Sequence, residues 1–435
     1  MPSARKWVSY TAEDLHETKQ QVLSWAARFH TCCVLDNQQY QSPQHRFEFI
    51  AAAGALDQID AASGNAFNLL SGFSGKHRDW LFGHFSFTLK SETEGLASRL
   101  PDHIGFPDLF FFIPQIIIQL GPDGLLIGSF QDDHDQVLAA IRDEPVDRIA
   151  QAASGAISVS ARIDRDHYLK IIRDLKAHIL RGDCYEINFC QEFFSEGAVV
   201  EPVALFRSLN RLSPSPFSAF YRVGERYLLC ASPERYLQKK GNRILSQPIK
   251  GTMPRAHADG HEDDQLRQAL YRSEKDRVEN VMVVDLVRND LSKICEPDTV
   301  RVDELFGIYS FPQVHQMISS VSGQLKPGPD WPQLIAKTFP MGSMTGAPKR
   351  RVLELIEQYE TSARGLFSGA VGYVNPETDF DFNVVIRSLQ YNRSSQYLSY
   401  FAGSGITISS DPEKEYEECL MKVTAMETAL KNPGG

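Results

Sequence analysis

The chain has 435 residues, of which 42% are hydrophobic and 23% charged, a balance that excludes disordered, collagen-like and coiled-coil proteins. This length allows two or three domains. A chain this long buries enough surface on folding to be stable without disulfides. The 55 acidic residues outnumber the 45 basic ones, and the formal net charge is −10. General nucleic-acid binding is therefore disfavoured, and an anionic ligand must meet a local cluster of cations or a metal ion.

Seven scattered cysteines without a C-x-x-C motif argue against a disulfide framework or a zinc ribbon, and they indicate a reducing, cytoplasmic environment. The beginning of the chain contains no apolar segment, so we expect no signal peptide. The most apolar stretch, residues 106–128, is interrupted by Asp108, Pro114, Gln115 and Pro122. We expect no membrane-spanning segment there.

The first part of the chain mixes helical and strand patterns. Residues 11–29 have helical spacing, with Thr11 as the expected N-cap and two acidic residues in the first turn. Residues 110–120 and 125–130 predict two strands joined by a Gly-Pro-Asp-Gly turn. No cluster of catalytic side chains is apparent in this part.

From about Asp164 the chain becomes a longer series of helices and strands. An amphipathic helix ends near Gly182, a strand follows it, and two apolar segments around Gly224 predict a hairpin. Further helices are expected over residues 262–290, 349–359 and 412–430. The irregular alternation predicts an α+β protein rather than a Rossmann fold, and the absence of a Gly- or Ser-rich linker predicts one continuous body.

Two acidic pairs on predicted helices form the first candidate site. Asp276 and Glu279 are three residues apart, and so are Glu415 and Glu418, so each pair projects from one face of its helix. Hard oxygen ligands without a neighbouring His or Cys favour magnesium over zinc. The alternative is that these carboxylates form an ordinary solvated helix surface.

Two glycine-containing segments and one lysine complete the candidates. Residues 342–350 lack the P-loop pattern, yet their backbone N–H groups and those of residues 402–406 suit an anionic ligand. Each segment is also typical of a simple turn. Lys250 follows an apolar residue, so burial would lower its pKa and make it nucleophilic, whereas the alternative is a lysine whose ammonium reaches solvent.

Eight segments occur in an order that resembles the chorismate-utilising enzymes, over about residues 164–430. They are SPERY, PIKGT, ENVMVVDLVRNDL, GSMTGAPKR, GAVGYV, VVIRS, AGSGI and PEKEYEE. Within this family the resemblance is strongest to component I of aminodeoxychorismate synthase, because Lys250 of PIKGT stands where anthranilate synthase and isochorismate-type members generally have alanine. Isochorismate-type members also have a lysine base where this chain has Glu186, so a water-adding activity is not implied. Glu186 stands where the family usually has glutamine. The effect of this difference on the part of the site around residue 186 is left open.

The resemblance implies a fold that agrees with the α+β pattern: an antiparallel two-sheet β-sandwich with surrounding helices. It assigns residues 1–155 to the N-terminal region of this fold. Residues 156–435 are then the chorismate-binding catalytic region, packed with the first as one continuous body.

The resemblance also implies roles for individual residues. Glu279 and Glu418 match the magnesium ligands, with Asp276 and Glu415 in support. Lys250 matches a covalent nucleophile, and Glu234 a general acid whose pKa is raised by burial. The expected substrate-binding residues are Tyr373 and Arg387 for the enolpyruvyl carboxylate; Lys422, Gly403, Ser404 and Gly405 for the ring carboxylate; and Thr252, His315 and Thr345 for the ring.

The implied activity is a magnesium-dependent, transaminase-class conversion of chorismate and ammonia to 4-amino-4-deoxychorismate through a lysine adduct at C2. The product leads to p-aminobenzoate and folate, and the ammonia would come from glutamine through a separate glutaminase subunit. Two alternatives stay open, namely component I of anthranilate synthase and a non-catalytic chorismate-binding subunit. Neither nucleic acid nor a membrane is an expected partner.

Overall fold

The structure is a computed structural model that describes residues 4–40, 44–122, 124–145, 157–256 and 260–432. Its helices are α1 (Leu15–Ala26), α2 (Ala66–Lys76), α3 (Lys90–Thr93), α4 (His134–Arg142), α5 (Arg165–Leu180), α6 (Pro202–Leu212), α7 (Gly260–Arg272), α8 (Glu274–Ser292), α9 (Trp331–Thr338), α10 (Lys349–Tyr359) and α11 (Pro412–Lys431). Its strands are β1 (Lys6–Tyr10), β2 (Thr31–Asp36), β3 (Phe49–Ala61), β4 (Leu81–Phe85), β5 (Leu109–Gly121), β6 (Gly124–Ser129), β7 (Ser160–Ala161), β8 (Glu186–Ser195), β9 (Phe217–Val223), β10 (Arg226–Ser232), β11 (Arg235–Lys240), β12 (Arg243–Gln247), β13 (Ile249–Pro254), β14 (Arg301–Ser310), β15 (Val314–Gln324), β16 (Gly346–Ala347), β17 (Ala370–Val374), β18 (Phe380–Asn383), β19 (Ser388–Asn392) and β20 (Tyr397–Ile406).

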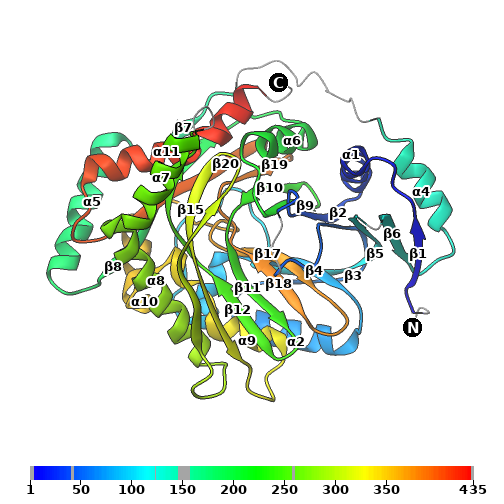
Figure 1. Ribbon diagram of the computed structural model, residues 1–435, viewed down its shortest axis with the longest axis horizontal. Helices are drawn as coiled ribbons and strands as arrows, with labels where there is room; N and C mark the ends of the chain where they lie inside the picture. The colour runs from blue at the N-terminus through cyan, green and yellow to red at the C-terminus, as the bar shows by residue number, and fades with distance from the viewer. Residues whose placement is uncertain (1–3, 41–43, 123, 146–156, 257–259, 433–435) are drawn as a thin grey trace.

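The strands pair antiparallel and form two layers connected through the long strands β3 and β5. The first layer has the order β1-β6-β5-β3-β2-β9-β10-β19-β20-β8, which runs across Figure 1 from right to left. The second layer continues from β5 through β4-β17-β18-β11-β12-β15-β14, with β13 also paired to β15. Both layers thus combine strands from the first 155 residues with later ones. The predicted antiparallel two-sheet sandwich is confirmed.

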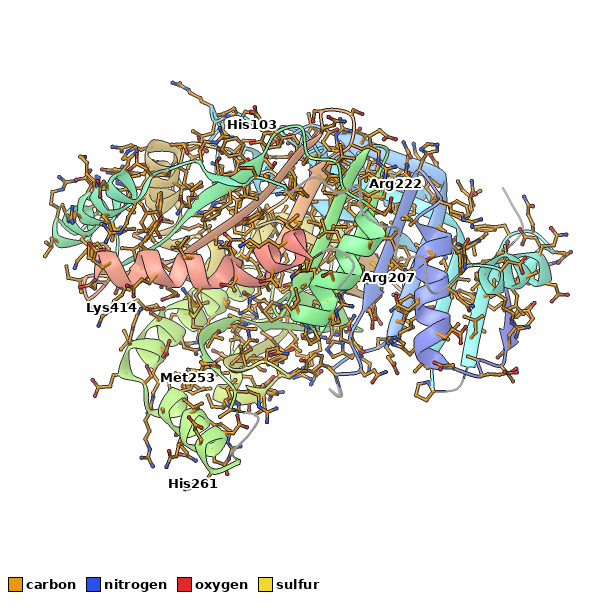
Figure 2. The ribbon with its side chains drawn as sticks, turned by 90° about the horizontal axis from the view of Figure 1, so that it is seen from above. His103, Arg207, Arg222, Met253, His261 and Lys414 are labelled. Atoms are coloured by element: carbon orange, nitrogen blue, oxygen red, sulfur yellow. The ribbon has the colours of Figure 1, made fainter. Side chains whose placement is uncertain are left out.

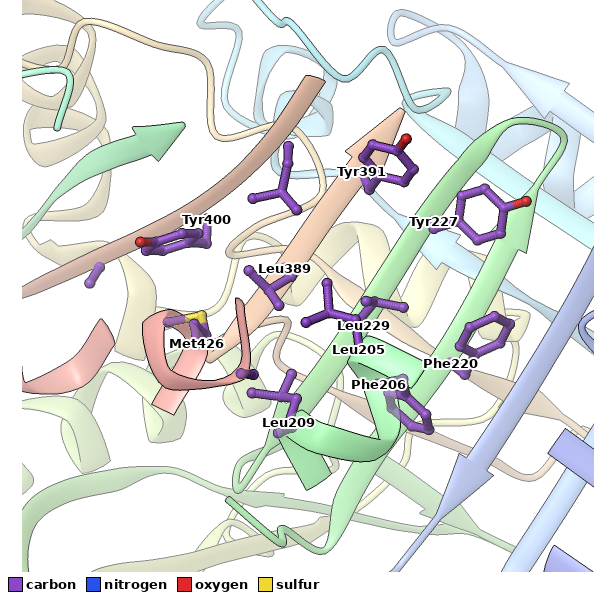
Figure 3. Packing of buried hydrophobic residues seen from close by; sticks show 14 of the residues in the cluster. Leu205, Phe206, Leu209, Phe220, Tyr227, Leu229, Leu389, Tyr391, Tyr400 and Met426 are labelled. Carbon is purple, nitrogen blue, oxygen red and sulfur yellow. The ribbon is translucent and has the colours of Figure 1, made fainter. Parts of the chain in front are cut away.

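Three hydrophobic clusters hold the layers and helices together. One lies between the layers and includes Phe82 and Tyr221, and another joins the second layer to α2, α8 and α9. The largest covers the outer face of the first layer under α1, α5, α6, α10 and α11. Figure 3 shows part of it, where α6 and α11 place Phe206 and Met426 against β9, β10, β19 and β20. Burying such faces is the main term that stabilises the sandwich.

Most local elements follow the sequence pattern, with two corrections. The two predicted hairpins are confirmed as β5–β6 and β9–β10. Helix α1 begins after Asp14, which accepts a hydrogen bond from the Glu17 N–H, so the N-cap is Asp14 and the prediction of Thr11 was wrong. The single helix expected over residues 262–290 is two helices. Ser273 has extended backbone between them, and its hydroxyl caps α8 by accepting from the Asp276 N–H.

The candidate site lies where β8, β13 and β20 approach helices α8 and α11. Seen from above, the start of α11 at Lys414 lies on the same side of the molecule as Met253 of β13 and His261 of α7 (Figure 2). All seven cysteines are buried free thiols. Among the described residues, no helix is both long and apolar enough to cross a membrane.

Candidate active site

Lys250 and Glu186 form a buried ion pair where β13 approaches β8. Lys250 lies at a register shift between Ile249 and Thr252, an irregularity that re-aims a side chain away from the regular ladder. Its Nζ donates a hydrogen bond to Glu186 Oε1 at 2.6 Å, and the two side chains are only 11% and 3% exposed. The alternative in which the ammonium of Lys250 reaches solvent is excluded, because a buried carboxylate holds it.

The pKa of Lys250 is raised, and the expectation of a lowered pKa was wrong. Burial acts to lower this pKa, but the negative charges of Glu186, Glu279 and Glu234 together raise it well above its usual range. Desolvation is the only one of these effects that the residues next to Lys250 in the sequence indicate, because the three carboxylates come from other segments. Lys250 is thus protonated in this state and must lose a proton before it can act as a nucleophile.

Gly405 leaves the space in which this ion pair sits. A Cβ at Gly405 would lie 2.6 Å from Glu186 Oε1 and 2.7 Å from Lys250 Nζ. At Gly403 a Cβ would instead lie 1.8 Å from the Phe189 carbonyl oxygen of the paired strand β8. The two glycines are therefore required for different reasons. Gly405 leaves room for the ion pair of the site, and Gly403 lets β20 pair closely with β8.

We expect Gly405→Ala to fold and to lose most of its activity, because its Cβ displaces the ends of two flexible side chains. Gly403→Ala is the matched control, and it should lose about 3 kcal/mol or more of stability, because its Cβ meets rigid backbone. Thermal unfolding measures the loss of stability, and the rate of the catalysed reaction measures the loss of activity. Equal destabilisation by both changes would contradict the assignment of Gly405 to the site and of Gly403 to the sheet.

The Ser404 side chain points away from Lys250, and the expected contact of the 403–405 backbone with a ring carboxylate stays a prediction. Successive residues of a strand face opposite sides of the sheet, and the Cβ position of the neighbouring Gly405 faces Lys250. Ser404 is instead directed at Tyr168 of α5, on the helix-covered face. The glycine pair supplies the backbone at the site, without the serine side chain.

Glu234 lies in the turn between β10 and β11 and is 4% exposed. Burial raises its pKa to about 7, although the Ser343 hydroxyl and the positive charges of Lys250 and Arg387 act to lower it. The predicted raised pKa of Glu234 is confirmed. A carboxyl with this pKa is substantially protonated near neutral pH, as a general acid must be.

Arg387 and Tyr373 do not form the expected pair. Arg387 lies beside Glu234, and burial lowers the pKa of its guanidinium. Among the described residues no carboxylate oxygen lies within 4 Å of the Arg387 guanidinium, so its donors suit an anion. Tyr373 packs against Trp80 between the layers, where Asp381 is its main charged neighbour. The pairing was wrong because Tyr373 faces the inside of the sandwich.

The three residues expected to contact the substrate ring differ in their exposure and in their hydrogen-bond partners. Thr252 is exposed on β13, two residues beyond Lys250. His315 is 1% exposed, and its ring nitrogens lie 2.9 Å from Ser310 Oγ and 3.0 Å from Asp263 Oδ1. The buried Thr345 hydroxyl donates to the Met341 carbonyl at 3.2 Å. His315 and Thr345 thus have protein partners, and their contact with a ring stays a prediction.

The predicted acidic residues of α8 and α11 lie side by side around a lysine. Lys275 Nζ is 3.3 Å from Glu415 Oε1, 3.6 Å from Glu418 Oε2 and 3.8 Å from Glu279 Oε1. Glu415 is 1% exposed and Glu279 is 8% exposed, so the alternative of a fully solvated surface is excluded for these two. Sequence reasoning missed Lys275, although it precedes Glu279 by four residues on the same helical face.

Lys422 and Asp276 border this acidic group from two sides. Lys422 Nζ lies 2.8 Å from Glu418 Oε1 and donates to the Gly403 carbonyl at 2.9 Å. It thereby connects the acidic group to the glycine pair, and its contact with a ring carboxylate stays a prediction. Asp276 lies on the other side, where a Cβ at Gly251 would be 3.0 Å from its Oδ1.

The donor set fits a hard divalent cation, although the side chains as placed do not yet surround one. Glu279 Oε1 and Glu415 Oε2 are buried without a hydrogen-bond partner among the described residues. Burial raises the pKa of Glu279 to about 7. For Glu418, burial also acts to raise the pKa, but the positive charges of nearby lysines act more strongly and lower it to about 2. In the described ranges no three acidic, His or Cys side chains converge on a metal position, and the Lys275 ammonium lies among Glu279, Glu415 and Glu418. Buried carboxylate oxygens without partners suit magnesium.

Comparisons with known proteins agree with this geometry. The chain is 36% identical over 341 residues to aminodeoxychorismate synthase component 1 of Klebsiella aerogenes, covering 78% of this chain and 75% of the relative. It is 32% identical over 358 residues to anthranilate synthase component 1 of Thermus thermophilus, covering 80% and 77%. The crystal structure of anthranilate synthase component I from Streptococcus pneumoniae superposes with a TM-score of 0.77 at 24% identity, covering 89% of this chain and 93% of that one, and shows the shared fold. The sequence profile of the chorismate binding enzymes matches residues 13–428, and the chain therefore belongs to the chorismate-binding enzyme family.

Proposed function

We propose that the chain is component I of aminodeoxychorismate synthase and converts chorismate and ammonia to 4-amino-4-deoxychorismate. The observation that carries this proposal is the buried ion pair of Lys250 with Glu186, with the carboxyl of Glu234 close enough to act on the pKa of the lysine. An amine at this position suits covalent catalysis on the substrate ring. The Klebsiella relative, which bears this name, supports the choice.

The proposed reaction begins when Lys250 gives up a proton, for which Glu186 Oε1 is an acceptor at 2.6 Å. The neutral amine adds at C2, the double bonds shift, and the C4 hydroxyl leaves as water with a proton from Glu234. Ammonia then adds at C4, the double bonds shift back, and Lys250 leaves from C2. Two allylic displacements place nitrogen at the carbon that lost oxygen, and the balance is chorismate plus ammonia giving aminodeoxychorismate plus water.

Binding of a substrate dianion by a net acidic protein requires local positive charge. The Arg387 guanidinium suits the enolpyruvyl carboxylate, because two parallel N–H bonds can meet two oxygens. Lys422 and the backbone at Gly403 and Gly405 would face the ring carboxylate. Glu279, Glu415 and Glu418, with Asp276 nearby, would hold magnesium, and a bound ion would neutralise that carboxylate and withdraw electrons from the ring.

We expect Glu279→Gln and Glu418→Gln each to abolish measurable magnesium binding and turnover. Each change removes one charged ligand from a site with few protein ligands. Magnesium titration by calorimetry measures the binding directly. Glu417→Gln on the exposed face of α11 is the matched control and should bind as the unaltered protein does. Unchanged affinity in the first two variants would contradict the metal site.

Product analysis tests the proposed function. The purified chain is incubated with chorismate, magnesium and an ammonium salt, and the products are separated and identified by mass. Aminodeoxychorismate supports the proposal, whereas anthranilate identifies the second candidate, which the Thermus relative favours. The absence of any turnover would support a non-catalytic chorismate-binding subunit. We further propose that glutamine replaces ammonium only when a glutaminase partner is added, so glutamine turnover by the chain alone would contradict a two-subunit enzyme.

A further inference from the structure

We propose that Lys275 is an internal counter-ion that holds the cation position of the acidic site in the metal-free protein and is displaced when magnesium binds. This inference rests on the proposed magnesium site. It assigns to Lys275 a role in setting metal affinity, which is distinct from the role of the carboxylate ligands.

The contacts of Lys275 are those of a cation shared among ligands. Its Nζ lies within 4 Å of Glu279, Glu415 and Glu418, which come from two different helices. The three distances, 3.3 to 3.8 Å, are all longer than about 2.7–2.9 Å, the usual length of a charge-assisted hydrogen bond. The ammonium therefore donates one long hydrogen bond, to Glu415 Oε1 at 3.3 Å, and is attracted to the other two carboxylates at longer distances.

Two oxygen atoms of this group of three carboxylates stay without a hydrogen-bond partner despite the nearby lysines. Glu279 Oε1 and Glu415 Oε2 are buried and accept no hydrogen bond from any residue that the structure describes. Lys422 does not fill this role, because its ammonium is already bound to Glu418 Oε1 and to the Gly403 carbonyl. A divalent ion with oxygen ligands would satisfy the atoms that Lys275 leaves without partners.

Lys275 can leave without a change in the fold. It lies in the first turn of α8, and its side chain is 46% exposed, whereas that of Glu415 is 1% exposed. The lysine therefore reaches the carboxylates from the solvent side. Rotation of its flexible four-carbon stem returns the ammonium to water, while the carboxylates stay on their helices.

The test compares magnesium binding by Lys275→Met and the unaltered chain, by calorimetry with magnesium chloride alone. If the lysine occupies the site about nine-tenths of the time, its removal should tighten binding about tenfold. Lys275→Arg keeps a cation in place and should stay close to the unaltered affinity. Lys293→Met is the control for net charge, because Lys293 pairs with Asp290 farther along the same helix.

A second measurement does not depend on a variant. Acetylation of the Lys275 amine by a water-soluble reagent, followed by peptide mass analysis, should become several-fold faster at saturating magnesium, because the displaced ammonium reaches solvent. Equal or weaker magnesium affinity in Lys275→Met, or acetylation that magnesium leaves unchanged, would overturn the role of Lys275 alone. Absence of magnesium binding in every chain would overturn the metal site itself and this inference with it.

Discussion

Lys250→Arg is expected to lower the rate of aminodeoxychorismate formation by at least about a thousandfold while the protein stays folded. A guanidinium keeps its proton at any accessible pH, so arginine retains the ion pair with Glu186 and loses the nucleophile. The variant should also form no covalent adduct. The measurement is intact and peptide mass after incubation with chorismate and magnesium in the absence of ammonia.

The matched control is Lys90→Arg, which makes the same change in another buried lysine. Lys90 is 2% exposed and pairs with Glu357, away from the candidate site. This variant should keep its activity. A loss of activity in Lys250→Arg alone would then result from the position of Lys250 and not from the exchange of a buried lysine for arginine. If the unaltered chain gave no adduct of chorismate less water on the PIKGT peptide, and Lys250→Arg kept its rate and product, the lysine would only pair with a carboxylate. The anthranilate alternative would then gain support.

Glu234→Gln is expected to lower turnover by about 10²–10⁴-fold, the usual contribution of a general acid. Glutamine has nearly the same shape but cannot supply the proton that removes the C4 hydroxyl as water. Chorismate affinity, measured by calorimetry, should change little, because the substrate carboxylates bind elsewhere. A variant that keeps its rate would show that the hydroxyl leaves without this carboxyl.

The pH dependence follows from the pKa of Glu234, which is about 7. In the proposed mechanism the acid form is the active one, so kcat/KM with ammonia delivered from glutamine by the proposed partner should fall as the pH rises above 7. With ammonium salt, the fraction of free ammonia rises over the same range and offsets this fall, so the profile should be flat from about pH 7 up to the pKa of ammonium. A rate that rises steeply with ammonium salt above pH 7 would mean that the acid stays protonated there.

Much of the fold could be predicted from the sequence, because local patterns and short turns specify it. The hairpins β5–β6 and β9–β10 and helix α11 formed where alternation, turn residues and helical spacing placed them. The division of residues 262–290 into two helices was missed. Ser273 is as compatible with a helix as with a cap, and only the packing of α7 and α8 selects the cap.

The candidate site was predictable where one element carries the information and not where several elements meet. The spacing of Glu415 and Glu418 places both on one face of α11, next to α8, as expected. Tyr373 was misplaced because a strand offers two faces, and the neighbouring layer decides which face meets the site. Lys275 was missed because its three carboxylate partners come from two helices.

By itself, the sequence determined the family, through eight ordered segments, and the α+β class, through the pattern of its elements. The resemblance to that family implied the antiparallel sandwich and pointed to the acidic pairs, the glycine pair, Glu234 and Lys250 as site residues. Only the tertiary structure decided the charge state of Lys250, whose partner Glu186 is 64 residues away in the chain. A pKa depends on charges through space and on burial, and both are fixed only when distant segments pack together.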